Sequence, residues 1–184
     1  MQQEYTDQEL QVLLAKDSDQ AIILIFQRYY SYLCQAVYKI IPDENLVEDL
    51  VQEVFLELWR KREKLQINTS LKAYLRRAAV NRSLNYIRDR KIRFDVEESE
   101  TPLASTNPTA GQQIETMELQ GAIDQAIDRL PERCRAVFVL SRFEDMSYIE
   151  IARQLGISVK TVENQISKAL KLLREALSSH WGET

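Results

Sequence analysis

Polar and basic side chains recur on one face of a predicted helix near the C-terminus, and their types are those that read nucleic acid. Lysine ammonium groups bind phosphates, whereas Thr, Glu, Asn and Ser donate to or accept from the edges of bases. The residues of this face are Lys160, Thr161, Glu163, Asn164, Ser167, Lys168 and Lys171. These residue types predict a DNA-binding surface rather than a catalytic site.

The stretch that leads into this helix has the spacing of a helix-turn-helix, which would hold the polar face outward. Ser147 and Glu150 match the S-x-x-E capping box at the start of a helix. Gly156 stands where the chain must reverse, because glycine adopts a positive φ at little cost, and Ser158 can cap the next helix. The residues predicted to face inward are Ile149, Ala152 and Leu155, then Val162, Ile166, Ala169 and Leu173. The alternative is a helical hairpin without a role in DNA binding.

The charge of the chain is strongly segregated. The formal net charge is −4, which by itself argues against a nucleic-acid partner. Residues 60–93, however, carry twelve Lys and Arg residues and only two acidic residues. A basic block within an acidic chain is the pattern expected of a protein that binds a polyanion. The alternative is a solvated helix face that is rich in long cationic side chains.

A helix with two distinct faces is predicted directly before the basic block. Pro42 ends the preceding helix, and Asp43 can cap the new one. Its apolar residues recur at helical spacing and make one stripe for a core. They are Val47, Leu50, Val51, Val54, Phe55 and Leu58. The other face shows Asp49, Gln52, Glu53 and Leu56.

These elements predict an all-α protein with two small helical domains joined by a flexible acidic linker. A polar loop at residues 68–70 precedes a further helix, which Ser70 can cap. The segment 95–113 is acidic and polar and contains two prolines, as expected of a linker. We therefore assign residues 1–93 to the first domain, residues 94–114 to the linker, and residues 115–184 to the second domain with its helix-turn-helix.

Catalytic and metal-binding patterns are missing from the sequence. It has no Gly-rich phosphate loop, no H-E-x-x-H motif and no nucleophile elbow, and its single histidine is His180. Cys34 and Cys134 are expected to be buried, reduced thiols, with a disulfide as the alternative. We therefore predict no enzyme, no small-molecule substrate, no cofactor and no metal. The polar N-terminus and the lack of a long apolar run predict a cytoplasmic protein without direct membrane insertion.

Three blocks of the chain, in this order, resemble the extracytoplasmic-function (ECF) sigma factors of the sigma-70 family. The helix by which that family binds core RNA polymerase is similar to EDLVQEVFLELWRKREKL, residues 48–65. Its helix for the −10 promoter element is similar to SLKAYLRRAAVNRSLNYIRDRK, residues 70–91, and its −35 domain to residues 130–175. The resemblance implies a sigma factor that binds core RNA polymerase and promoter DNA and directs transcription initiation. An anti-sigma factor is implied as a further partner.

The resemblance assigns the polar face of residues 48–65 to the polymerase. The side chains that would meet the clamp helices of the largest subunit are Asp49, Gln52, Glu53 and Leu56. A leucine on a polar face favours a docking site, whereas the two acidic residues are also typical of a solvated helix. Trp59 is expected in the core rather than at this contact.

The same resemblance places the −10 element along the loop at residues 68–70 and the helix that follows. Asn68, Thr69 and Ser70 would receive an unstacked base, because short polar groups can bond to its edge. An ordinary helix cap is the alternative for Ser70. The DNA path would be lined by Lys72, Arg76, Arg77, Asn81, Arg82 and Arg88. For Asn81, a buried hydrogen bond to the helix backbone is an equal alternative, because Asn is unfavourable within a helix.

The resemblance assigns the −35 element to the C-terminal polar face and Arg142. Many family members have Arg where this chain has Glu163, Gln165 and Lys168, so the −35 sequence is not implied. A dimeric helix-turn-helix regulator that binds an operator explains residues 130–175 equally well, but it does not explain the basic block. A helical interaction protein explains neither the charge segregation nor the polar helix face.

Overall fold

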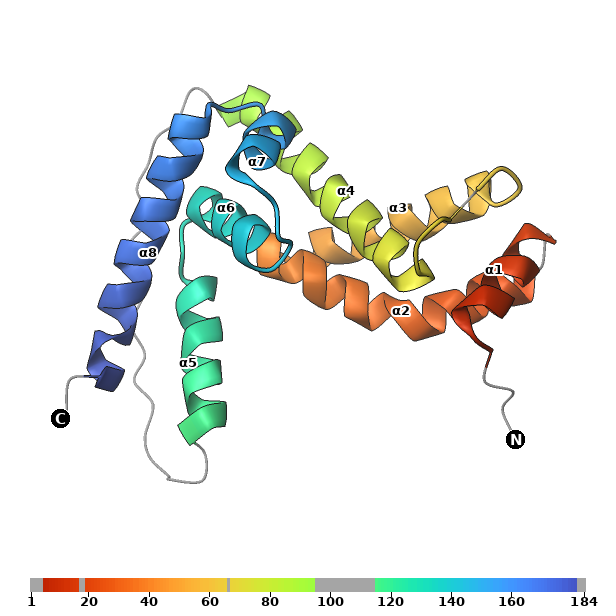
Figure 1. Ribbon diagram of the computed structural model, residues 1–184, viewed down its shortest axis with the longest axis horizontal. Coiled ribbons are helices and arrows are strands. Elements are labelled where there is room, and N and C mark those ends of the chain that lie inside the picture. Colours follow the sequence, from red (N-terminus) through yellow and green to blue (C-terminus); the bar gives the residue numbers. More distant parts are fainter. Residues whose placement is uncertain (1–4, 17–18, 66, 95–114, 182–184) are drawn as a thin grey trace. The chain divides into compact units, whose positions relative to one another are not determined.

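The computed structural model describes residues 5–16, 19–65, 67–94 and 115–181 (Figure 1). These residues form eight α-helices, so the predicted all-α fold class is confirmed. The chain divides into two compact units between Tyr86 and Ile87. The acidic linker predicted at 94–114 lies, apart from Phe94, outside the described residues, and the two boundaries between the predicted segments stay a prediction.

The first unit holds three helices and most of a fourth, and two of their starts follow signals in the sequence. Asp43 Oδ1 accepts a hydrogen bond from Leu46 N at 3.1 Å, and Ser70 Oγ accepts one from Ala73 N at 3.2 Å. Both predicted caps are therefore confirmed, and each satisfies a backbone N–H that has no partner inside the helix. The helices are α1 (Asp7–Ala15), α2 (Asp19–Ile40), α3 (Glu44–Lys61) and α4 (Leu71–Phe94), which continues past the division after Tyr86.

The core of the first unit lies where α2 packs against α1 and α3. All six residues of the predicted apolar stripe on α3 are buried, so the orientation of this helix is confirmed. α4 contributes fully buried leucines, among them Leu71, Leu75 and Leu84. Ser83 is also buried, and its hydroxyl donates to the carbonyl of Ala79 at 2.9 Å, which satisfies its polar group inside the helix.

Tyr29 joins α2 to α1 through a hydrogen bond from its hydroxyl to Asp7 Oδ1. The tyrosine is only 7% exposed, and Arg28 Nη1 lies 3.5 Å from the same carboxylate oxygen. Burial, reinforced by the bond to Asp7 and by its negative charge, raises the pKa of Tyr29 from 10 to about 12. The folded protein therefore holds the phenolic proton more tightly than the unfolded chain does.

Replacing Tyr29 with Phe is expected to change how stability depends on alkaline pH. Because the folded pKa is raised, the stability that the phenol contributes is complete below pH 10 and is lost as the pH rises towards 12. Tyr29→Phe should flatten this fall and lower stability at pH 7 by about 1 kcal/mol through the lost hydrogen bond. Urea unfolding between pH 7 and 11 measures both effects. The exposed tyrosine of the same helix provides the control Tyr38→Phe, and equal alkaline falls in the two variants would contradict the prediction.

The second unit contains α5 (Glu115–Asp128), α6 (Glu132–Arg142), α7 (Tyr148–Leu155) and α8 (Val159–Trp181). The longest of these helices, α8, packs against the other three. The capping box is present: Ser147 Oγ accepts from Glu150 N at 3.3 Å, and Glu150 Oε2 accepts from Ser147 N at 2.8 Å. Gly156 ends α7 with a φ of 65°, and Ser158 Oγ accepts from Thr161 N at 3.0 Å. The predicted helix-turn-helix geometry is thus confirmed.

The inward face of α7 differs from the prediction at one residue. Ile149 is 62% exposed, whereas Ile151 is fully buried beside Ala152 and Leu155. Each residue turns the helix by about 100°, so Ile149 and Ile151 lie on nearly opposite sides. The assignment of Ile149 to the core was therefore wrong. On α8 the four predicted core residues, from Val162 to Leu173, are all buried.

A charged residue that the sequence did not single out lies inside the second unit. Seven consecutive residues of α6, Cys134 to Leu140, are buried, and they include Arg135 at 1% exposure. Arg135 Nε donates to the carbonyl of Ile127 at 3.1 Å, and its Nη2 lies 3.9 Å from Asp128 Oδ1. Its guanidinium thus lies at the C-terminal end of α5, where helix carbonyls and the helix dipole favour a positive charge.

Both cysteines are free thiols, as expected, so the disulfide alternative was wrong. Cys34 is half-buried, and Cys134 is buried with its Sγ donating to Gln165 Oε1 at 2.9 Å. Burial raises the pKa of each thiol, against the opposing effect of the nearby Lys168 charge on Cys134. A raised pKa keeps a thiol protonated and therefore a poor nucleophile.

Candidate docking and nucleic-acid surfaces

The polar face of α3 is presented to solvent. Its predicted docking residues follow the helical spacing i, i+3, i+4, i+7, which places them on one side of the helix. All four are exposed, and they are Asp49, Gln52, Glu53 and Leu56. Leu56 is 47% exposed, although leucine usually lies in the core. An apolar side chain among acidic ones is chemically suited to a partner surface that carries both apolar and basic groups.

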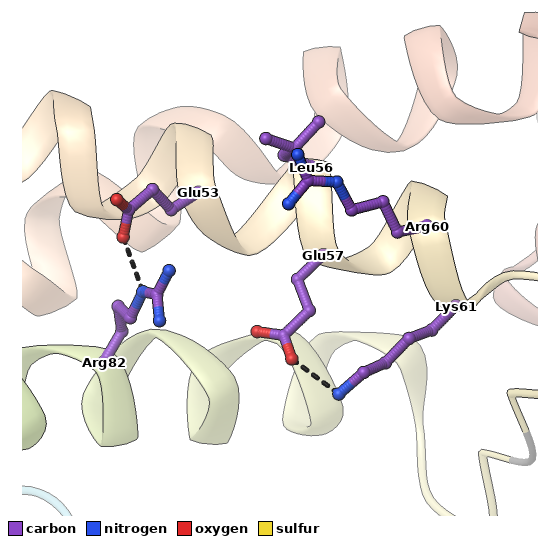
Figure 2. Close-up of a pocket in the computed structure, with 6 residues that line it drawn as sticks. All are labelled: Glu53, Leu56, Glu57, Arg60, Lys61 and Arg82. Carbon is purple, nitrogen blue, oxygen red and sulfur yellow. Dashed lines mark hydrogen bonds and ion pairs between the residues drawn. The ribbon is translucent and has the colours of Figure 1, made fainter.

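A shallow open groove extends this face toward α4. It is lined by Glu53, Leu56, Glu57, Arg60, Lys61 and Arg82 (Figure 2). Arg82 Nε of α4 lies 2.6 Å from Glu53 Oε2, and Lys61 Nζ lies 2.5 Å from Glu57 Oε1. The bond from Lys61 lowers the pKa of Glu57. The predicted polymerase-binding face and the predicted DNA-binding helix are thus joined by an ion pair.

Three lining residues of the groove were missed by the sequence reasoning. Glu57, Arg60 and Lys61 are all exposed. Glu57 follows Glu53 by four residues and Arg60 follows Leu56 by four, so continuing the face by one more turn would have found both. Trp59 is neither fully buried nor exposed, and the guanidinium carbon of Arg62 lies 3.8 Å from its ring centroid.

The loop before α4 presents short polar side chains. Asn68, Thr69 and Ser70 are all exposed. Ser70 is the helix cap, so the alternative given for this residue is confirmed, and Thr69 Oγ1 donates weakly to the Ser70 carbonyl at 3.4 Å. Asn68 and the Thr69 hydroxyl are therefore the groups of this loop best placed to meet a base edge.

Five of the six predicted DNA-contacting residues of α4 fall into two groups rather than one row. Arg77, Asn81 and Arg88 are exposed and follow i, i+4, i+11, so they share one face of the helix. Because Asn81 is exposed, its alternative as a buried bond to the backbone was wrong. Lys72 and Arg76 lie on a different face, where both meet a tyrosine of α2.

The outward face of α8 carries the predicted −35 set. All of these residues are exposed except Thr161, whose hydroxyl lies 2.8 Å from Ser158 Oγ in the helix cap. Lys160 is 3.2 Å from Glu163 and Lys171 is 3.9 Å from Glu175, so two of the lysines form ion pairs along the helix. Asn164, Ser167 and Lys168 occupy adjacent exposed positions at i, i+3, i+4. Arg142 is exposed at the last residue of α6, which packs on α8.

Neither a metal site nor a membrane span is found within the described ranges. No three His, Cys, Asp or Glu side chains there are grouped closely enough to hold an ion. None of the helices in those ranges combines the length and the apolar character that crossing a membrane requires.

Two family models match the chain over the parts that hold these surfaces. The model for sigma-70 region 2 matches residues 25–92, and the model for sigma-70 region 4 matches residues 120–173. The ECF RNA polymerase sigma factor SigE of Mycolicibacterium smegmatis is 31% identical over 149 residues, which are 80% of this chain and 58% of that protein. SigW of Bacillus subtilis is 28% identical over 171 residues, 88% of this chain and 91% of that protein.

The chain belongs to the ECF sigma factors of the sigma-70 family. A third relative, the ECF sigma-E factor of Escherichia coli, is 27% identical over 188 residues, 97% of this chain and 96% of that protein. Among solved structures, CnrH in complex with the cytosolic domain of CnrY is 25% identical, with a TM-score of 0.48. The match extends over 94% of this chain and 97% of the CnrH chain.

Membership of the family decides between the functional classes that the sequence left open. This ECF sigma factor is not an enzyme and directs RNA polymerase to promoters. The dimeric-regulator alternative explained only the C-terminal helix-turn-helix, whereas the region 2 match covers most of α2 and all of α3. The match to region 4 covers the helix-turn-helix and most of α8.

Proposed function

We propose that this ECF sigma factor docks on core RNA polymerase through the exposed face of α3, and reads its promoter through two separate surfaces. The loop at residues 68–70 and α4 bind the separated −10 strand, and α8 enters the major groove of the −35 element. The supporting observation is that α3, α4 and α8 each bury a stripe of side chains on one side, so that the core holds their polar groups outward on the other.

Leu56 is the centre of the proposed polymerase contact. It is the large apolar side chain on an exposed face that otherwise carries Asp49, Gln52 and Glu53. An amphipathic helix with apolar and basic residues would cover Leu56 and pair with the acidic groups. The clamp helices of the largest polymerase subunit are the proposed partner, as the family resemblance implies.

The basic surface of α4 is proposed to hold the −10 strand chiefly through phosphates, because Lys and Arg contacts release counterions and add affinity that depends on salt. Asn68 and Thr69 are the proposed base-reading groups, since an unstacked base offers its edge to short polar side chains. Asn81, which is exposed on α4, is a further candidate for this role.

The proposal extends to regulation and location. An anti-sigma factor that competes with polymerase would have to cover the exposed α3 face, and Leu56 supplies the apolar anchor for such a partner. The protein is proposed to act in the cytoplasm, where core polymerase and promoter DNA are present.

Run-off transcription tests this function directly. Purified core RNA polymerase is incubated with fragmented DNA from the source genome, with and without the protein. We expect discrete transcripts that depend on the protein, and their mapped start sites locate the promoter elements. If no transcript appears and the protein does not co-elute with core polymerase, the proposed function is wrong.

Lys168→Ala is expected to weaken promoter binding by about tenfold, because a lysine on a recognition helix contributes on the order of 1–3 kcal/mol at its base. Lys168 is exposed on the polar face of α8. Binding of the reconstituted holoenzyme to promoters substituted base by base in the −35 element gives both the loss and the position that it affects. Arg174→Ala, at an exposed cation of α8 that lies six residues beyond Lys168 and outside the predicted set, is the control. Equal effects of the two variants would count against the assignment.

A further inference from the structure

Two positively charged side chains of α4 converge on a single tyrosine of α2. Arg76 Nη1 donates a hydrogen bond of 2.7 Å to the hydroxyl of Tyr32, and the Arg76 guanidinium carbon lies 5.5 Å from the ring centroid. Lys72 Nζ lies 4.6 Å from the same centroid. Lys72 is exposed, while Tyr32 and Arg76 are half-buried. The ring is therefore supported by its surroundings while the lysine charge remains in solvent.

A neutral aromatic group suits this position because of what it does to the two charges. Side chains four residues apart on a helix are neighbours, and two cations there repel each other. The face of an aromatic ring attracts cations, and a phenol oxygen accepts from a guanidinium. Tyr32 therefore offsets the repulsion without adding a negative charge.

We propose that Tyr32 is a positioning residue for promoter DNA, which holds Lys72 and Arg76 together as one two-cation site for the phosphates of the −10 strand. The inference rests on the proposed function, because that function assigns the two cations to DNA. Side chains already held in their binding geometry lose less conformational entropy when the ligand arrives. Tyr32 itself need not touch the nucleic acid; it acts through the two cations.

The experiment uses holoenzyme reconstituted with each variant and the promoter fragment located by run-off mapping, with the dissociation constant measured at several salt concentrations. Tyr32→Leu should weaken promoter binding about fivefold, and Tyr32→Phe, which keeps the ring, about twofold. The slope of log K against log salt should become shallower in Tyr32→Leu by about 0.7 for each phosphate that the variant no longer binds. Tyr38→Leu, at an exposed tyrosine of the same helix, should change neither quantity.

A second set of variants separates positioning from a general structural role. In a background that carries Lys72→Ala and Arg76→Ala, Tyr32→Leu should have no further effect on promoter binding, because the cations that it positions are gone. A further loss of the same size in that background overturns the proposal. If the two cation variants weaken binding and Tyr32→Leu does not, positioning is wrong while the proposed function stands. If the cation variants themselves leave promoter binding unchanged, the −10 assignment fails and the role of Tyr32 fails with it.

Discussion

Holoenzyme is not expected to form when Leu56 is replaced by Asp. Leu56 is 47% exposed on the polar face of α3, and the six residues of the buried stripe lie on the other side of the helix. The substitution removes the apolar anchor at the centre of the proposed contact and places there a charge that would lose its water on binding. Central apolar anchors contribute at least about 2 kcal/mol to binding, which corresponds to about thirtyfold in affinity. We therefore expect the affinity for core polymerase to fall by about thirtyfold or more.

The fold of the Leu56→Asp variant should be intact, because the side chain contributes little to the core. Its urea unfolding curve is therefore expected to match that of the unsubstituted protein, while co-elution with core polymerase is lost. Val12→Asp is the matched control, since Val12 is 54% exposed on α1, away from the proposed contact. Normal binding by Leu56→Asp, with binding by Val12→Asp also normal, would show that the α3 face is not the docking surface.

Arg135→Ala is expected to destabilise the second unit by about 3 kcal/mol, because the variant loses the packing of a buried side chain and a hydrogen bond to a carbonyl. Arg135 is 1% exposed and binds the end of α5 through Ile127 and Asp128. Hydrogen exchange of the full chain can locate the change. Amides of the second unit should lose protection, whereas those of the first unit should not, because each unit has its own core.

Two further variants show which property of Arg135 matters. Arg133→Ala, at an exposed position of the same helix, should have almost no effect on exchange. Arg135→Met keeps most of the buried volume and should cost less than Arg135→Ala, and the difference between them isolates packing from hydrogen bonding. Protection in Arg135→Ala equal to that in Arg133→Ala would mean that the buried guanidinium contributes nothing measurable to stability.

Local signals in the sequence predicted the starts of α3, α4 and α7 and the orientation of α3. The caps at Asp43, Ser70 and Ser147 and the turn at Gly156 depend on residues only a few positions apart, so they could be found without tertiary structure. The apolar stripe of α3 is similarly determined by helical spacing alone. For this reason the exposure of the Leu56 side chain was also predicted correctly.

The features that were missed depend on contacts between distant parts of the chain. Tyr32 meets Arg76 across 44 positions, and nothing in either local sequence indicates the other. Arg135 looks like one more surface cation until α6 is seen to be buried over seven consecutive residues. On α7, Ile149 and Ile151 are the same residue type two positions apart, and only the packing of α7 on α8 decides which of them enters the core.

The ion pair between Glu53 and Arg82 has a consequence for genetics. At 2.6 Å the two groups neutralise each other, so a charge reversal at Glu53 also leaves an unpaired cation on α4 and thereby alters the DNA-binding helix. Second-site suppressors of such a mutant would then arise either within this protein, at Arg82, or in the polymerase. A swap that places Arg at 53 and Glu at 82 keeps the internal pair and exchanges the charges shown to the two partners. This swapped allele separates a defect in binding polymerase from a defect in the ion pair itself.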